Sequence, residues 1–176
     1  MWDRLVLSPE PPASSGLPMA AVLAPLFEDD EGDIRVVLTK RPDTMPTHAG
    51  HLAFPGGRPD PGDDGPISTA LREAHEEVGI PPESVEVLGF LPAVDTVQFS
   101  LMVVPVVGRL AAEPTLIPSP REVDRILLPR LVDLAEDANW HWEVWRGRKV
   151  WFYEIEGEIL WGATASMTRH MLGLPT

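Results

Sequence analysis

The segment Arg72-Glu73-Ala74-His75-Glu76-Glu77-Val78-Gly79 decides both the fold and the chemistry expected of this chain. Apolar residues recur through it at spacings of three and four, which predicts a helix from about Ile67 to Val78 with one buried face. The helix is expected to stop at the glycine that follows, because glycine adopts the left-handed conformation that ends helices. Glu73, Glu76 and Glu77 then share one face, since residues i, i+3 and i+4 are neighbours on a helix.

Three carboxylates on one helical face create an electrostatic problem, because each charge raises the pKa of its neighbours. Such a face must be fully solvated or must bind a hard divalent cation, and Mg²⁺ and Mn²⁺ prefer oxygen ligands. Gly56 and Gly57 precede the helix at the end of a predicted strand, and a glycine carbonyl can approach a cation closely. Arg72 can hold a neighbouring carboxylate through a bidentate pair. This sequence context favours a bound divalent cation over a fully solvated face.

Short apolar and β-branched runs outside this helix predict a set of strands. They cover residues 20–27, 34–39, 52–54, 85–91, 101–110, 126–128, 140–145, 150–155 and 158–161. A helical turn at 131–138 and a last helix at about 163–172 complete the pattern. Residues 1–18 contain four prolines and are predicted as an extended arm, followed by a single domain over residues 19–176. The mixture of strands and helices predicts an α/β or α+β domain with a mixed sheet.

Charge is the unusual feature of the composition. There are 27 Asp and Glu against 14 Lys and Arg, which gives a net charge of −13 at pH 7. Such a surface repels long polyanions, so a nucleic-acid-binding protein is not expected. No apolar run approaches the ~20 residues of a membrane helix, and no signal-peptide pattern is visible. Cysteine is absent, which excludes disulfides and thiolate nucleophiles. We therefore expect a soluble, cytoplasmic protein without a membrane partner.

Aromatic residues concentrate near the C-terminus, where five of the six tryptophans lie between Trp140 and Trp161. Core and hairpin packing is the simpler interpretation, because large aromatic side chains dominate core burial. A platform on which a ligand stacks is the alternative. The acidic run from Glu28 to Asp33 lies between two predicted strands and is interpreted as a solvated hairpin tip.

The glutamate segment resembles the Nudix box, whose pattern is G-x5-E-x7-R-E-U-x-E-E-x-G-U with U aliphatic. Gly57 and Arg72–Ile80 match this pattern. Asp63 stands where the family has Glu, one extra residue separates it from Arg72, and Ala74 fills the first aliphatic position. The resemblance implies an α/β/α sandwich with a mixed sheet and a metal-dependent hydrolase of nucleoside diphosphate derivatives.

A second pattern resembles the motif of the coenzyme A pyrophosphatase branch, roughly L-L-T-x-R-S-x3-R-x3-G-x3-F-P-G-G. Arg41, Gly50 and Phe54–Gly57 match it, whereas Pro46 replaces its second arginine. Leu160–Ala165 is also similar to this branch. The resemblance implies cleavage of the pyrophosphate bond of coenzyme A or its derivatives to 4′-phosphopantetheine and 3′,5′-ADP. A homodimer is compatible with it.

The resemblance assigns roles residue by residue. Gly57, Glu73, Glu76 and Glu77 would hold Mg²⁺ or Mn²⁺, and Arg72 would orient the glutamates. Glu77 or Glu76 would act as the base, with Glu122 as a rival from a later loop. The expected substrate-binding residues are Arg41, His48 and Arg58.

Two alternatives remain at this point. The absence of the second arginine leaves room for a broader ADP-ribose or ADP-X pyrophosphatase. A non-catalytic Nudix-like domain that binds a nucleotide or a protein is the other, although such a domain has no need of the intact glutamates.

Overall fold

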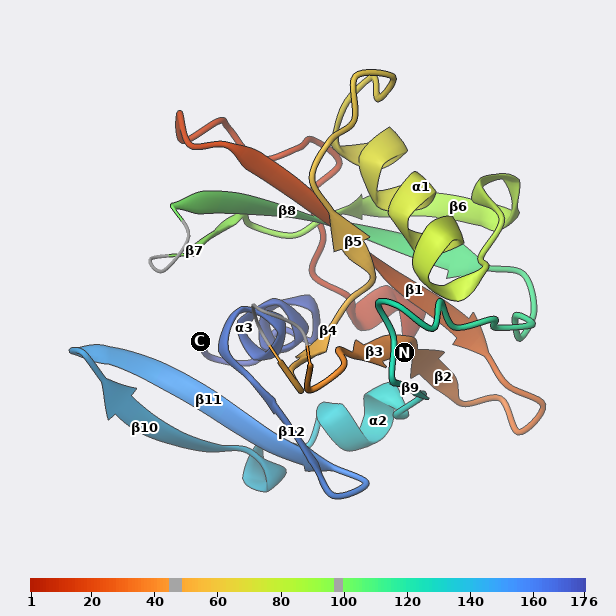
Figure 1. The fold of residues 1–176 in the computed structure, drawn as a ribbon. Coiled ribbons are helices and arrows are strands. Elements are labelled where there is room, and N and C mark those ends of the chain that lie inside the picture. The colour runs from red at the N-terminus through yellow and green to blue at the C-terminus, as the bar shows by residue number, and fades with distance from the viewer. Residues whose placement is uncertain (45–48, 97–99) are drawn as a thin grey trace.

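The computed structural model describes residues 1–44, 49–96 and 100–176 (Figure 1). Its central sheet is built on two long strands, β1 (Met19–Glu28) and β8 (Leu101–Leu110), which run parallel with Ala20 opposite Val103. The flanking strands all pair antiparallel: β2 (Ile34–Val36) and β5 (Gly56–Gly57) with β1, and β6 (Val85–Phe90) and β7 (Val94–Thr96) with β8. The predicted mixed sheet is therefore confirmed.

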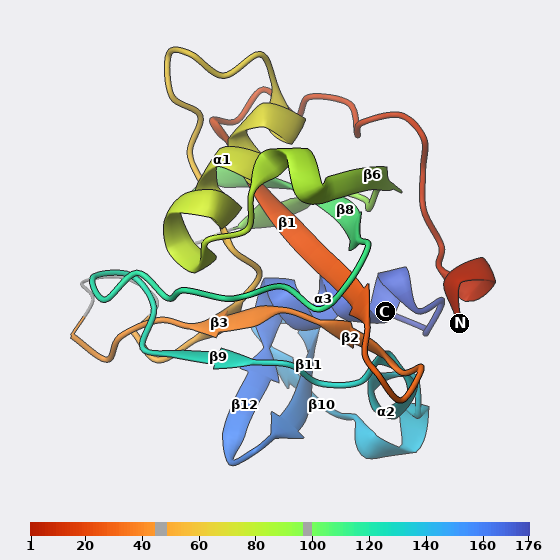
Figure 2. The ribbon, with the colours of Figure 1, turned by 90° about the vertical axis from the view of Figure 1, so that its right-hand side faces the viewer.

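Both faces of this sheet are covered. Ala21, Leu23 and Phe27 of β1 belong to the core that also contains the apolar face of α1 (Pro66–Val78), whereas Ala24 and Leu26 belong to the core that contains α3 (Gly162–Met171). Figure 2 shows α1 above β1 and α3 below it. Because both faces are buried, the central strands read as continuous apolar runs, and the layers form the predicted α/β/α arrangement.

Helix α1 has the expected length because its ends are specified locally. Ser68 Oγ accepts a hydrogen bond from the Gly65 amide and donates one to the Gly65 carbonyl. Gly79 ends the helix with φ of 76°, a left-handed conformation that glycine adopts without a steric penalty. Because both ends are fixed, the position of each carboxylate along α1 is fixed as well.

Two smaller sheets lie beneath the central one. The first contains β4 (Leu52–Ala53), β3 (Leu38–Lys40) and β9 (Arg125–Leu127). The second contains β10 (His141–Trp145), β11 (Arg148–Ile155) and β12 (Glu158–Trp161). Short helical elements complete the chain: η1 (Trp2–Arg4), η2 (Pro82–Ser84), α2 (Leu131–Leu134) and η3 (Asp137–Asn139).

The expectation of one strand over 34–39 was wrong. Its first half pairs with β1, and its second half pairs with β9 of another sheet. The change occurs at Val37, whose amide donates to the Pro25 carbonyl at 3.0 Å. Periodicity does not reveal such a switch of partner, because the backbone stays extended throughout. Strand β7 was also not predicted.

Residues 1–18 contact the body of the molecule at several points. Ser8 forms an isolated bridge with Phe90, and the Val6 amide donates to the Met171 carbonyl. The division of the chain into an arm and one domain remains a prediction. Within the described residues, no helix is long and apolar enough to cross a membrane.

Candidate active site

The predicted carboxylate face of α1 lies against β5. Glu77 is buried, with only 5% of its surface exposed, while Glu73 is partly buried and Glu76 is exposed. The Gly56 amide donates a hydrogen bond to the Glu77 carboxylate. The three glutamates thus differ in environment, although they share one helical face.

The two glycines of β5 are required for different reasons. A Cβ on Gly56 would lie 2.4 Å from the Ala21 carbonyl oxygen, so only glycine lets β5 approach β1 this closely. A Cβ on Gly57 would lie 2.5 Å from Glu73 Oε1. The backbone at Gly57 and the Glu73 carboxylate therefore border the same small space, which a side chain would fill.

Arg72 organises the N-terminal side of the site. Its Nη1 donates to Glu73 at 2.9 Å and to Glu76 at 3.2 Å, and its Nη2 donates to Asp63 at 3.0 Å. Asp63 also accepts a hydrogen bond from the Thr69 hydroxyl. Asp63, which stands where the Nudix pattern has Glu, is therefore the anchor of the arginine that holds the glutamates.

Burial and charge shift the pKa values of these groups strongly. Burial raises the pKa of Glu77 to about 8, and the charges of Glu73 and Glu122 add to the shift. Burial also raises the pKa of Glu73, against the opposing effect of Arg72. The hydrogen bonds from Arg72 hold the pKa of Asp63 well below its usual range. Glu77 thus carries a proton at neutral pH that a nearby cation would displace.

Two residues from distant parts of the sequence reach this face of α1. Arg41 follows β3 and acts electrostatically on Glu77, and its Nε is buried without a hydrogen-bond partner among the described residues. Glu122 is exposed, and its charge influences both Glu73 and Glu77. Its loop is tied to the C-terminal end of α1, where the Ser119 amide donates to the Glu77 carbonyl at 2.8 Å.

The Arg58 side chain is not brought into this cluster. The Arg58 side chain is exposed, and only the Arg58 carbonyl takes part, as an acceptor for Arg72 Nη2 at 2.9 Å. His48 lies outside the described residues, as does Pro46. His51, which was not singled out as a site residue, contacts Trp161 and accepts a hydrogen bond from the Arg41 amide through its carbonyl. Sequence gave no signal for that contact, because it depends on how β12 packs against β4.

The cluster suits a hard divalent cation. Its donors are carboxylate and carbonyl oxygens, the pKa of Glu77 is raised by burial and by the charges of Glu73 and Glu122, and Gly57 leaves space beside Glu73. A second acidic group, Asp29, Glu31 and Asp33, has carboxylate oxygens within 4.8 Å of one another. Asp29, however, already binds Arg35 at 2.5 Å and accepts from the amides of Glu31 and Asp33, which is the bonding of a hairpin tip.

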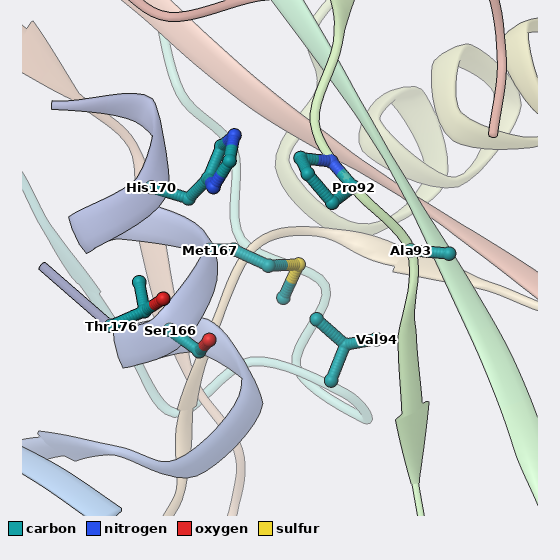
Figure 3. Close-up of a pocket in the computed structure, with 7 residues that line it drawn as sticks. All are labelled: Pro92, Ala93, Val94, Ser166, Met167, His170 and Thr176. Atoms are coloured by element: carbon teal, nitrogen blue, oxygen red, sulfur yellow. The ribbon is translucent and has the colours of Figure 1, made fainter. Parts of the chain in front are cut away.

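A small cavity of about 130 Å³ lies apart from this cluster, between α3 and the segment that enters β7. Met167 occupies its middle, between Pro92 and Val94, with His170 at one side (Figure 3). None of the candidate site residues that the structure describes lines this cavity, so the cavity does not extend the described part of the site.

Comparisons with known proteins agree with this fold. The family model described as NUDIX domain matches residues 17–146. Nudix hydrolase 22, chloroplastic, of Arabidopsis thaliana is 42% identical over 158 residues, which are 83% of this chain but 51% of the relative. The chain thus spans about half the length of that relative. Uncharacterized Nudix hydrolase NudL of Enterobacter sp. is 38% identical over 156 residues, covering 86% of this chain and 80% of the relative.

A solved structure supports the same fold. The MutT/nudix family protein from Enterococcus faecalis superposes with a TM-score of 0.62 at 16% identity, over 92% of this chain and 63% of that one. The α/β/α layers and the carboxylate-bearing helix together define a Nudix fold. The chain belongs to the Nudix hydrolase family.

Proposed function

We propose that this protein is a metal-dependent pyrophosphohydrolase that cleaves coenzyme A or its derivatives to 4′-phosphopantetheine and 3′,5′-ADP. The observation that supports the hydrolase is that Glu73 borders the Gly57 backbone, while Glu73, Glu122 and Arg41 all act electrostatically on the buried Glu77. The choice of coenzyme A rests on the second motif, in which Arg41, Gly50 and Phe54–Gly57 match the coenzyme A pyrophosphatase branch.

Glu73, Glu76, Glu77 and the Gly57 carbonyl are the groups that would hold Mg²⁺ or Mn²⁺. When bound, such an ion lowers the pKa of water and neutralises charge on phosphate oxygens. Arg72 keeps Glu73 and Glu76 pointing toward one another through its two hydrogen bonds. Arg41 offers a phosphate oxygen a guanidinium whose Nε has no hydrogen-bond partner among the residues that the structure describes.

The reaction is an attack by water on one phosphorus of the diphosphate. The new P–O bond forms as the bridging P–O bond breaks, and the bridging oxygen leaves with the second phosphate. The proton of the water passes to a carboxylate. Glu77 or Glu76 takes this role in our proposal, and Glu122 is the rival, because it is exposed to solvent and its charge acts on Glu73 and Glu77.

A broader ADP-ribose or ADP-X pyrophosphatase is the second candidate. It is favoured by Pro46, which replaces an arginine of the coenzyme A motif and removes a cation that could bind the 3′-phosphate. Comparing kcat/KM for coenzyme A, dephospho-coenzyme A and ADP-ribose separates the two. Equal values with and without the 3′-phosphate would reject coenzyme A as the preferred substrate.

The most direct test is a screen of dinucleotides with Mg²⁺ or Mn²⁺, with products resolved by mass, because the mass identifies the cleaved bond. The absence of product across the panel would favour the non-catalytic alternative. A cytoplasmic location, the lack of nucleic-acid and membrane partners, and a homodimer remain predictions from the sequence.

Substitutions in the cluster test the mechanism. Glu73→Gln or Glu77→Gln should lower kcat by at least ~100-fold, as expected when a ligand or base is lost. Glu83→Gln, an exposed glutamate in η2, is the matched control and should leave kcat unchanged. Turnover near wild type in both cluster variants would refute the mechanism.

The rival base is tested by the pH dependence of the rate. If Glu122 accepts the proton, Glu122→Gln should lower kcat and remove the acidic limb of its pH profile. An unchanged rate and profile would assign the proton transfer to Glu76 or Glu77.

A further inference from the structure

The sheet β10–β11–β12 has two faces of different character. Trp151, Tyr153 and Leu160 lie on the face that packs toward α3 and are buried. The residues that alternate with them point to the opposite face, because side chains alternate along a strand. On that opposite face the register places His141 opposite Phe152, and Phe152 opposite Trp161.

Aromatic rings cover this outer face. The rings of His141 and Phe152 are stacked with centroids 5.2 Å apart and planes inclined by 13°, and those of Phe152 and Trp161 are 6.2 Å apart and inclined by 9°. Trp145 meets the edge of Trp161 at 6.4 Å. We call His141, Trp145, Phe152 and Trp161 the aromatic platform.

The platform forms one wall of a groove. A hollow of about 280 Å³ is lined by Trp145, Phe152 and Trp161 together with Glu143 and other residues of the same hairpin. Trp145 is 56% exposed, so its ring is accessible to a ligand and is not packed in the core. Nearly parallel rings beside an open hollow are a suitable surface for a further planar ring.

The platform is linked to the Arg41 backbone through His51. Trp161 contacts His51 with ring centroids 4.7 Å apart, and the His51 carbonyl accepts the Arg41 amide at 3.0 Å. Lys40 Nζ also binds Glu158 at 2.9 Å, which fastens β3 to β12. In Figure 2, β12 lies below β3 and β9, and α1 lies above them. A substrate whose diphosphate is held near Arg41 therefore has the platform within its vicinity.

We propose that the aromatic platform binds the base of the nucleotide substrate, specifically an amino-bearing base such as adenine. This inference rests on the proposed function, which supplies a substrate with a diphosphate and a base. The carboxylate of Glu143 at the groove repels phosphate and accepts hydrogen bonds, so it suits the exocyclic amine of the base. The phosphates then lie at the Arg41 end, and the base lies at the Trp145 end.

The experiment measures the dissociation constant of 3′,5′-ADP by calorimetry in the full-length protein. This compound contains the base but no diphosphate bond, so binding is measured without hydrolysis. Trp145→Leu keeps an apolar side chain and removes the ring, and it should weaken binding about tenfold or more. Trp142→Leu is the matched control, because Trp142 lies on the same strand and is 51% exposed but pairs with Trp151 on the other face. This control should bind as wild type does.

A second measurement separates the base from the phosphates. Ribose 5-phosphate, which lacks the base, should bind Trp145→Leu and wild type equally, and in turnover assays the effect of Trp145→Leu should fall mainly on KM. Equal 3′,5′-ADP affinities for Trp145→Leu, Trp142→Leu and wild type would overturn the proposal, even in an active enzyme. A change of Trp145→Leu from dimer to monomer with unchanged affinity would likewise overturn it and assign the platform to a second copy. Failure of the proposed function would instead appear as an absence of hydrolysis in wild type.

Discussion

Glu77 shows how one residue acquires its chemistry from its surroundings. Its place on α1 follows from the sequence, but its burial depends on tertiary packing, and the Gly56 hydrogen bond comes from β5. Burial raises its pKa to about 8, with the charges of Glu73 and Glu122 adding to the effect. The metal-free native state therefore holds a proton on Glu77 between about pH 4.5 and 8 that the unfolded chain releases, so stability falls as pH rises through this window.

A divalent cation bound at Glu77 must displace that proton. The affinity for Mn²⁺ should therefore rise up to about tenfold per pH unit below pH 8 and level off above it. Calorimetry at several pH values, in buffers of different ionisation enthalpy, measures both the affinity and the released proton. In Glu77→Gln the pH dependence should largely disappear. A flat affinity between pH 6 and 8 in wild type would contradict the assignment.

Gly57 offers a second test at the scale of a single residue. Gly57→Ala would place a Cβ 2.5 Å from Glu73 Oε1, so the carboxylate has to move. We expect at least a tenfold loss of metal-dependent kcat with little change in fold. Gly62→Ala, in the loop before α1, meets nothing within 4 Å and serves as the control. Comparable activity in the two variants would show that the space beside Glu73 is not needed.

At the scale of elements, the loop before α1 is fixed by one ion pair that also serves the site. Arg72 joins Asp63 of the loop to Glu73 and Glu76 of the helix. The Asp63 side chain is only 6% exposed, so few water molecules could solvate its charge if Arg72 were lost. The pair therefore couples the position of the loop to the direction of the glutamates.

The pH dependence of folding should report this ion pair. Hydrogen bonds from Arg72 lower the pKa of Asp63, so its contribution to stability is present above about pH 4 and is lost as pH falls further. Asp63→Asn should unfold at lower denaturant concentration at pH 6, and its difference from wild type should shrink toward pH 2.5. Asp60→Asn is the control, because Asp60 is 68% exposed and lies 3.8 Å from Arg72. An equal effect of both substitutions would refute the special role of Asp63.

At the scale of the whole molecule, four neighbouring tryptophans divide between core and surface. Trp140 and Trp151 are buried in the core near α3, whereas Trp142 and Trp145 are exposed. The fully buried Arg169 lies over the Trp151 ring at 3.4 Å from its centroid and binds Asp137 at 2.7 Å. This arginine connects α3, β11 and η3, so we expect the packing of these three elements to depend on it.

Arg169→Leu should therefore lower the free energy of unfolding by about 3 kcal/mol, because it removes a buried side chain together with its cation–π and hydrogen-bond contacts. Denaturant titration measures the change. Arg121→Leu, an exposed arginine, should stay within about 0.5 kcal/mol of wild type. If Arg169→Leu lowers the free energy of unfolding by less than 1 kcal/mol, the packing of α3, β11 and η3 does not rely on this contact.

The local features of this protein could be predicted from neighbouring residues. The bounds of α1, the shared face of Glu73, Glu76 and Glu77 and most strands could be predicted, because helical periodicity, capping residues and strand alternation act over a few neighbouring residues. The Nudix pattern could be recognised for the same reason. The arm at 1–18 and the roles of the site residues remain predictions.

Contacts between distant residues could not be predicted in this way, because they depend on how the elements pack. The change of sheet at Val37, the approach of Arg41 and Glu122 to Glu77, and the division of the tryptophans between core and surface all depend on long-range packing. Packing also determines how far each carboxylate is removed from water: Glu77 is buried, Glu73 is partly buried and Glu76 is exposed. Their sequence spacing is local, whereas the chemistry that each can perform depends on what the rest of the chain places around it.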